Sequence, residues 1–123
     1  MKTIMLVDDS ATILMSIKSV LTKAGYGVET AVDGKDALGK VTGGLRPDLI
    51  ISDVNMPQMD GITFAREVRK AAGMRFTPIL MLTTESEASK RAQAKAAGAT
   101  GWLVKPVQPE QLLGVIKQVV PGA

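Results

Sequence analysis

The chain has 123 residues, of which 46% are hydrophobic and 22% are charged, and its net charge is +3. At roughly 150 residues per domain, this length predicts a single domain over residues 1–123 with one hydrophobic core and no room for a second domain. Cysteine and histidine are both absent, which excludes disulfides, thiolate chemistry, zinc sites built from these ligands and histidine acid–base catalysis.

Short apolar segments alternate along the chain with amphipathic ones. The apolar segments are the expected strands, at residues 3–7, 27–32, 48–52, 77–83 and 100–104. A short apolar run such as residues 3–7 is typical of a parallel strand that is buried on both faces, whereas residues 27–32, which include Glu29 and Thr30, form a weaker strand. Arg46-Pro47 favours extended backbone just before the third expected strand.

The segments between the strands repeat apolar residues at helical spacing and carry helix start and stop signals. The expected helices run from Ser10 to Gly25, from Asp33 to Gly43, from Asp60 to Gly73, from Ser86 to Gly98, and from Pro109 to Val120. Strands that alternate with helices predict a parallel sheet joined by right-handed crossovers. We therefore expect a three-layer α/β domain.

Charge and hydropathy narrow the classes of partner. The basic residues are scattered from Lys2 to Lys117, and only four residues are aromatic, so we expect a solvated surface and no nucleic-acid binding. No apolar run is longer than four residues, so we expect neither membrane insertion nor a signal peptide. These observations favour a cytoplasmic protein.

Polar residues gather where the expected strands end. Asp8 and Asp9 follow the first strand, Asp53 follows the third, Thr83 ends the fourth, and Lys105 follows the fifth. In open parallel sheets the ligand site lies outside the carboxyl ends of the strands. We therefore expect three carboxylates, one hydroxyl and one ammonium to meet at one edge of the sheet.

Each of these residues alone also has a purely structural explanation. Acids before a helix serve as caps, a lone aspartate after a strand forms turns, and Thr83 could cap the next helix. Those explanations do not account for three acids at neighbouring strand ends with a single lysine. Two carboxylates about 4 Å apart repel by roughly 4 kcal/mol at an effective dielectric of 20. A hard divalent cation such as Mg²⁺ is the natural partner of such a cluster, and a carboxylate beside it can accept a phosphoryl group.

Four segments together resemble the receiver domains of two-component response regulators. They are Val7-Asp8-Asp9-Ser10, the run from Asp53 to Gly61, Thr83-Thr84-Glu85, and Lys105-Pro106. The match runs from Lys2 to about Val120 and is most similar to the stand-alone, CheY-like members. The resemblance implies a flavodoxin-like, doubly wound (βα)5 fold with five parallel strands in the order 2-1-3-4-5.

The resemblance also implies residue roles. Asp53 matches the phosphoacceptor that becomes an aspartyl phosphate. Asp8, Asp9, Asp53 and the main-chain carbonyl of Asn55 match the Mg²⁺ ligands, with Asp8 acting largely through water and Mn²⁺ as a substitute ion. Lys105 matches the lysine that pairs with the phosphoryl group.

Further positions match the switch and the residues that tune the phosphorylated state. Thr83 matches the switch hydroxyl and Trp102 the switch aromatic, a position that is usually Tyr or Phe. Asn55, Thr84 and Glu85 match positions that tune the phosphoryl state. Thr84 is larger than the usual residue there, and the pair of Asn55 and Glu85 resembles chemotaxis regulators.

The implied function is phosphorelay signalling of the chemotaxis type. A histidine kinase or phosphotransfer protein would donate the phosphoryl group, and a phosphatase could remove it. The protein would catalyse only its own phosphorylation and dephosphorylation, as a monomer. Its target would bind the face formed by the last two helices and the strand between them, around Lys90, Lys95, Trp102 and Val107.

Two alternatives remain open, and a third is disfavoured by charge. A haloacid-dehalogenase-like phosphatase uses similar residues but needs an aspartate two residues after the nucleophile, where this chain has Asn55. An interaction module that works without phosphorylation would keep the fold without the chemistry. A flavodoxin-type cofactor site would place a phosphate beside Asp8 and Asp9, which would repel it.

Overall fold

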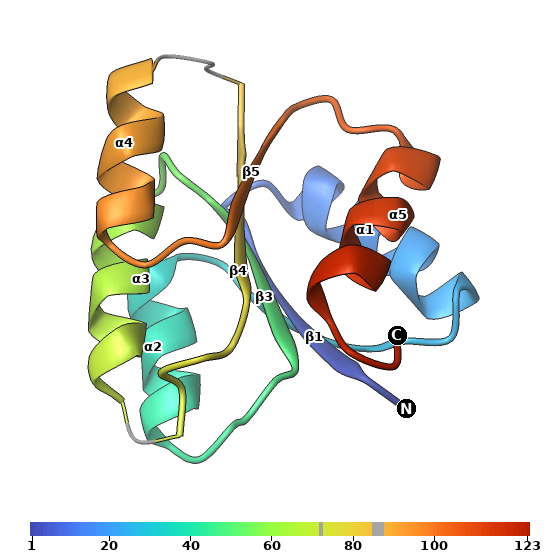
Figure 1. Ribbon diagram of the computed structural model, residues 1–123, viewed down its shortest axis with the longest axis horizontal. Helices are drawn as coiled ribbons and strands as arrows, with labels where there is room; N and C mark the ends of the chain where they lie inside the picture. The colour runs from blue at the N-terminus through green and yellow to red at the C-terminus, as the bar shows by residue number, and fades with distance from the viewer. Residues whose placement is uncertain (72, 85–87) are drawn as a thin grey trace.

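Five parallel strands form one sheet in the order β2-β1-β3-β4-β5 (Figure 1). The computed structural model describes residues 1–71, 73–84 and 88–123. The strands are β1 Thr3–Val7, β2 Gly27–Ala31, β3 Leu49–Asp53, β4 Ile79–Thr83 and β5 Gly101–Val104. The order agrees with the expectation from the sequence, and every pair of neighbouring strands is parallel.

Five helices cover the two faces of the sheet. They are α1 Ala11–Lys23, α2 Gly34–Thr42, α3 Gly61–Lys70, α4 Ala88–Ala96 and α5 Pro109–Val119. Figure 1 shows α1 and α5 on one side of the strands and α2, α3 and α4 on the other. The chain is therefore a three-layer, doubly wound α/β domain, as predicted.

The continuously apolar strands are explained by two separate cores. In β1, Ile4 and Leu6 belong to the core under α1 and α5, whereas Met5 and Val7 belong to the core under α2, α3 and α4. Successive side chains of a strand point to opposite faces of a sheet, so every position of β3 and β4 and every position of β1 after Thr3 is buried. Burial of both faces leaves only the strand ends available for polar side chains.

Three helix caps that the sequence indicated are made by side chains. Ser10 accepts a hydrogen bond from the backbone N–H of Ile13 at 3.3 Å. Asp33 accepts one from Asp36, and Asp60 one from Thr63, both at 2.8 Å. These bonds satisfy N–H groups that the first turn of a helix leaves without partners.

Some element bounds differ from the expected ones. β3 is one residue later than predicted and includes Asp53 as its last residue. β4 begins at Ile79 rather than at residue 77, because Pro78 has no N–H and the Thr77 carbonyl accepts a hydrogen bond from Arg69 instead. α3 ends at Lys70, before the expected end at Gly73. The fourth helix was expected to begin at Ser86, which lies outside the described residues, and the structure describes it over Ala88–Ala96.

The sheet order places a topological switch between β1 and β3. The chain moves outward from β1 to β2 and then returns to the other side of β1 to form β3. Ligand sites of open α/β sheets lie at such a point, outside the carboxyl ends of the strands. Within the described residues, none of the helices has the length and apolar character needed to cross a membrane.

Candidate functional site

Three carboxylates meet at the carboxyl ends of β1 and β3. Each of Asp8, Asp9 and Asp53 offers one oxygen, and these oxygens all lie within 4.8 Å of one another. Asp8 and Asp53 are buried, with 1% and 8% of their surface exposed, whereas Asp9 is exposed. The structure therefore brings together the three acids that the sequence placed at neighbouring strand ends.

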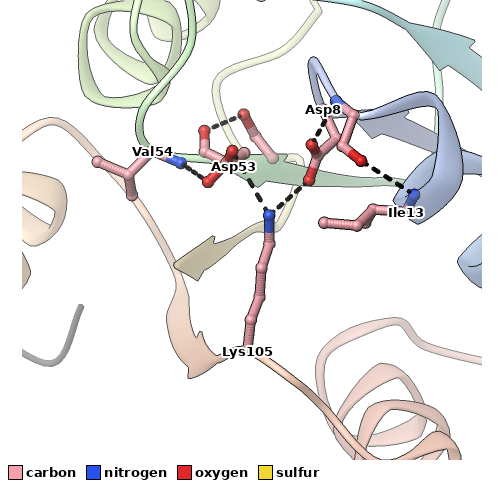
Figure 2. A network of polar contacts seen from close by, with 7 residues as sticks. Asp8, Ile13, Asp53, Val54 and Lys105 are labelled. Carbon is pink, nitrogen blue, oxygen red and sulfur yellow. Dashed lines mark hydrogen bonds and ion pairs between the residues drawn. The ribbon is translucent and has the colours of Figure 1, made fainter. Parts of the chain in front are cut away.

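Lys105 lies between two of these acids. Its Nζ is 2.7 Å from Oδ2 of Asp8 and 3.4 Å from Oδ2 of Asp53, and Figure 2 shows the ammonium pointing into the space between the two carboxylates. The backbone N–H of Lys105 donates to the Thr83 carbonyl at 2.7 Å. This bond ties the start of the loop after β5 to the end of β4 and so fixes where the lysine side chain begins.

The surroundings of Asp53 hold its carboxylate in place. Oδ1 accepts a hydrogen bond from the backbone N–H of Val54 at 2.8 Å (Figure 2). The Ser52 hydroxyl donates to the Asp53 carbonyl at 2.9 Å. A Cβ at Gly61 would lie only 2.1 Å from that same carbonyl, so the start of α3 can pack against Asp53 only through a glycine.

Neither Ser52 nor Gly61 was identified from the sequence as a supporting residue. The signal at Gly61 was a glycine directly after the capping Asp60, at a position where glycine is a poor helix former. Such a residue at a helix start indicates a close backbone approach. Ser52 gave no comparable signal, because serine is common both inside strands and at their ends.

Burial raises the pKa of Asp53 above the ordinary carboxyl value of 3.8. The positive charge of Lys105 and the Val54 N–H act in the opposite direction, and the negative charge of Asp8 raises the pKa further. The carboxylate form of Asp53 is therefore held at an energetic disadvantage that added positive charge would relieve.

Thr83 and Trp102 lie on the two strands beside this cluster. Thr83 is buried at the end of β4, one strand away from Asp53, and pairs in register with Val104. Trp102 pairs with Met81 and packs partly buried against the core under α2, α3 and α4. Its indole Nε1 is buried and has no hydrogen-bond partner among the described residues.

The other positions that the sequence singled out are Asn55, Thr84 and Glu85. Asn55 is exposed, two residues after Asp53. Thr84 is exposed and lines an apolar cavity of about 350 Å³ together with Ile13, Ile17, Lys105 and Val107. Glu85 lies outside the described residues.

The donor set fits a hard divalent cation. Mg²⁺ prefers oxygen ligands at about 2.1 Å, so two ligands on opposite sides of the ion are about 4.2 Å apart. The three carboxylate oxygens lie within 4.8 Å of one another, and Asp9 is the member that faces solvent. Asp8, Asp9 and Asp53 could hold such an ion with small side-chain movements.

Comparison with known proteins identifies the family of this chain. The family model described as the response regulator receiver domain matches residues 4–117. Protein PilG of Pseudomonas aeruginosa is 36% identical over 119 residues, which cover 97% of this chain and 87% of PilG.

Two solved structures are similar in both sequence and fold. Chemotaxis protein CheY4 of Vibrio cholerae is 51% identical, with a TM-score of 0.93 over 98% of this chain and 99% of that one. The receiver domain of sensor histidine kinase PA1611 from Pseudomonas aeruginosa is 29% identical, with a TM-score of 0.88 over 96% of both chains. The latter was solved with a magnesium ion coordinated in its active-site cleft.

Proposed function

This chain belongs to the response regulator receiver domain family and has a phosphorylation-dependent signalling function, and we propose that Asp53 is the residue that accepts the phosphoryl group. The observation that carries this assignment is the position of Lys105. Its ammonium lies within 4 Å of both Asp8 and Asp53. Asp8 shares this lysine and also has a fixed oxygen, which accepts a hydrogen bond from the Ser10 N–H at 2.9 Å. Of the three acids, however, only Asp53 ends the central strand β3.

In the proposed reaction an Asp53 carboxylate oxygen attacks the phosphorus of a phosphohistidine or of acetyl phosphate. The bond from phosphorus to the donor breaks, and the donor leaves with that bond's electron pair as imidazole or acetate. The product is an aspartyl phosphate. Lys105 pairs with the phosphoryl oxygens, and its charge favours the ionised, nucleophilic form of Asp53.

Asp8, Asp9, Asp53 and the main-chain carbonyl of Asn55 are the proposed ligands of Mg²⁺, for which Mn²⁺ may be substituted experimentally. The ion would supply the positive charge that neutralises the acids and the incoming phosphoryl group. The magnesium in the cleft of the PA1611 receiver domain supports this part of the proposal. The raised pKa of Asp53 also supports a bound cation. Burial disfavours the ionised carboxylate, and a nearby positive charge would favour that form again.

The activity of a haloacid-dehalogenase-like phosphatase explains the same residues less well. That chemistry needs an acid two residues after the nucleophile, and this position is the amide Asn55. The proposal therefore includes no separate substrate: the chain modifies only itself and then loses the phosphoryl group, at a rate tuned by Asn55, Thr84 and Glu85.

The phosphodonor would be a histidine kinase or phosphotransfer protein, because this chain has no histidine of its own. The apolar cavity lined by Ile13, Ile17 and Val107 opens beside Lys105. A donor helix that placed an apolar side chain there would bring its phosphohistidine toward Asp53. A cytoplasmic location and a monomeric state belong to the same proposal.

The proposed output is a change on the face formed by α4, β5 and α5. Thr83 would move toward the phosphoryl group and Trp102 would then turn inward, which biases a two-state equilibrium. The 51% identity to chemotaxis protein CheY4 supports a chemotaxis-type phosphorelay, and a partner phosphatase belongs to the same proposal. If Trp102 turns inward, beryllofluoride with Mg²⁺ should reduce its quenching by iodide, and Thr83→Ala should diminish that effect.

The test of the phosphoacceptor is labelling with radioactive acetyl phosphate in the presence of Mg²⁺. The wild type should be labelled and Asp53→Asn should not. Asp48→Asn is a matched control, because Asp48 accepts a hydrogen bond from the Thr3 N–H at the opposite end of β1. Labelling of Asp53→Asn at the wild-type level would refute the assignment.

A further inference from the structure

The turn between β2 and α2 contacts the main chain on both sides of the acid cluster. At its start, the Ala31 carbonyl accepts a hydrogen bond from the Asp8 N–H at 3.1 Å. At its end, the Gly34 N–H donates to the Met59 carbonyl at 3.3 Å. Met59 belongs to the loop after β3, which also carries Asn55, whose carbonyl is a proposed Mg²⁺ ligand. This turn therefore connects the segments that hold two of the proposed ligands.

The first turn of α2 is fixed by a reciprocal pair of hydrogen bonds. Asp33 accepts one from the Asp36 N–H at 2.8 Å, and the Asp36 carboxylate accepts one from the Val32 N–H at 3.1 Å. Gly34 is the first residue of the helix, and the N–H groups of a first turn have no partner within the helix itself. The Gly34 N–H is therefore held in a fixed direction and can bond to the Met59 carbonyl.

Gly34 approaches Met59 so closely that no side chain fits at this position. A Cβ at Gly34 would lie 2.6 Å from the Met59 carbonyl oxygen and 3.0 Å from the Cβ and Cγ atoms of Met59. The nearest atom belongs to the main chain, so a change of rotamer could not relieve the clash and the loop backbone would have to move. Gly34 does not have a positive φ. The contact with Met59, and not the conformation of Gly34 itself, therefore requires glycine.

The three residues between Asn55 and Met59 have little backbone freedom. Pro57 has a fixed φ and also restricts Met56 before it. Gln58 has a φ of 69°, and the Met59 N–H donates to the Pro57 carbonyl at 2.7 Å across it. A three-residue turn of this kind is rare and strained. A shift at Met59 is therefore transmitted to Asn55 and is not absorbed between them.

We propose that Gly34 is a positioning residue for the magnesium site, and that its contact with Met59 sets where the Asn55 carbonyl lies. The inference rests on the proposed function, because it concerns the ion that phosphoryl transfer to Asp53 would need. Residues that orient a metal ligand from behind typically change metal affinity by about 10- to 100-fold when they are replaced. Gly34 touches neither the ion nor the phosphoryl group, so its effect is on ion affinity.

Two alanine substitutions in α2 separate positioning from helix stability. Alanine is a better helix former than glycine, and a Cβ at Gly39 would meet no neighbouring segment within 4 Å. Gly39→Ala should therefore raise the melting temperature and leave the Mg²⁺ dissociation constant unchanged. Gly34→Ala should raise that constant about tenfold, as measured by calorimetric titration of the full chain with magnesium chloride. Equal constants for Gly34→Ala and the wild type would overturn the proposal and leave the phosphoacceptor assignment intact.

A second pair of variants tests the same contact without adding a side chain at Gly34, and so decides the question even if Gly34→Ala fails to fold. Asp33→Asn and Asp33→Ala lose the same charge, but only asparagine can still accept the hydrogen bond that caps α2. Asp33→Ala should bind Mg²⁺ several-fold more weakly than Asp33→Asn, because the Gly34 N–H is no longer held in place. Equal dissociation constants for these two variants would contradict the proposed role of Gly34.

Labelling by acetyl phosphate distinguishes a failure of this inference from a failure of the proposed function. At low Mg²⁺, Gly34→Ala should be labelled more slowly than the wild type, and at saturating Mg²⁺ the two rates should converge. A rate that stays low at saturating Mg²⁺ would overturn the proposal, because Gly34 would then act on more than ion affinity. A wild type that neither binds Mg²⁺ nor becomes labelled would refute the proposed function together with this inference.

Discussion

The ammonium of Lys105 lies 2.7 Å from a carboxylate oxygen of Asp8, although 97 residues separate the two in sequence. The same ammonium is farther from Asp53, at 3.4 Å. In the absence of other positive charge, Lys105 is therefore the counter-charge of the buried Asp8 and is shared with Asp53. A cation that takes over Asp8 would free the lysine to pair with a phosphoryl group on Asp53.

Removal of this lysine should destabilise the chain in a pH-dependent manner. Lys105→Ala leaves Asp8 and Asp53 buried with no ammonium between them, and loss of one partner of a buried pair costs about 3–5 kcal/mol. Because the charge of Lys105 lowers the pKa of Asp53, the variant should also raise that pKa. Urea unfolding of Lys105→Ala should show a smaller loss near pH 4, where protonation relieves the repulsion, than at pH 7.

Lys117→Ala on α5 is the control for this experiment, because Lys117 is exposed and should change stability by no more than about 0.5 kcal/mol. An equal loss for the two variants, or a Lys105→Ala loss that does not vary with pH, would contradict the shared-lysine account.

The charge of Asp53 should itself reduce stability at neutral pH. Because its pKa is higher in the folded chain than the ordinary 3.8, the folded state binds more protons than the unfolded state at pH values between the two. Stability therefore falls as pH rises through that window, and the loss is complete above the raised pKa. Asp53→Asn lacks this titration and should be more stable than the wild type at pH 7.

Thermal unfolding of both proteins from pH 3 to pH 7 measures this difference. The advantage of Asp53→Asn should be largest at pH 7 and should shrink toward pH 3. A variant that is less stable at pH 7, or a constant difference across the range, would mean that burial does not disfavour the Asp53 carboxylate.

Magnesium should stabilise the chain through Asp9. A ligand that binds only the folded state at a hundred times its dissociation constant adds about 2.7 kcal/mol. Asp9 is exposed, so Asp9→Asn should change stability without the ion by less than about 0.5 kcal/mol and yet remove most of the stabilisation by Mg²⁺. Glu29→Gln, an exposed site on β2 that loses the same charge, should respond to Mg²⁺ as the wild type does.

Melting curves with and without millimolar Mg²⁺ provide the measurement. Wild-type curves that coincide would count against a magnesium site at these acids. A loss of the Mg²⁺ response in Glu29→Gln equal to that in Asp9→Asn would show that net charge matters and the cluster does not.

Arg69 joins two loops, the one before β4 and the one before β5, a role that the sequence did not reveal. Its guanidinium donates to the carbonyls of Met74 and Thr77 at 2.8 and 2.6 Å and twice to that of Gly98 at 3.2 and 2.7 Å. Burial lowers the pKa of this guanidinium. Hydrogen bonds to a charged group are worth about 1.5–3 kcal/mol each, so Arg69→Met should destabilise the chain by about 2–3 kcal/mol or more.

The matched control is Arg66→Met, at an exposed position on the same helix, with an expected change within about 0.5 kcal/mol. Urea unfolding distinguishes the two. Similar stabilities for both variants would show that the carbonyls of these loops do not depend on Arg69.

The sequence predicted the layers and the convergence of the acids because both depend on local signals. Continuous apolar runs mark strands buried on both faces, and caps such as Asp33 and Asp60 mark where helices begin. The order followed from the resemblance and not from the residues. Contacts between distant segments could not be read in this way: the preference of Lys105 for Asp8, the close approach of Gly61 to Asp53, and the carbonyl contacts of Arg69 depend on tertiary packing.

Trp102 illustrates the same limit of prediction from sequence. Its place on the fifth strand was expected, but a burial pattern alone does not tell whether an indole N–H finds an acceptor. The structure shows that Nε1 is buried without one among the described residues. Only the packing of α4 against the edge of the sheet decides this.

Chemical trapping of the phosphorylated residue tests the central claim most directly. Borohydride reduces an acyl phosphate to an alcohol, so an aspartyl phosphate becomes homoserine at the modified position. After treatment with acetyl phosphate and Mg²⁺, peptide mass spectrometry should find homoserine at position 53 and at no other aspartate. Homoserine at position 8 or 9, or labelled protein with an unmodified Asp53, would contradict the account.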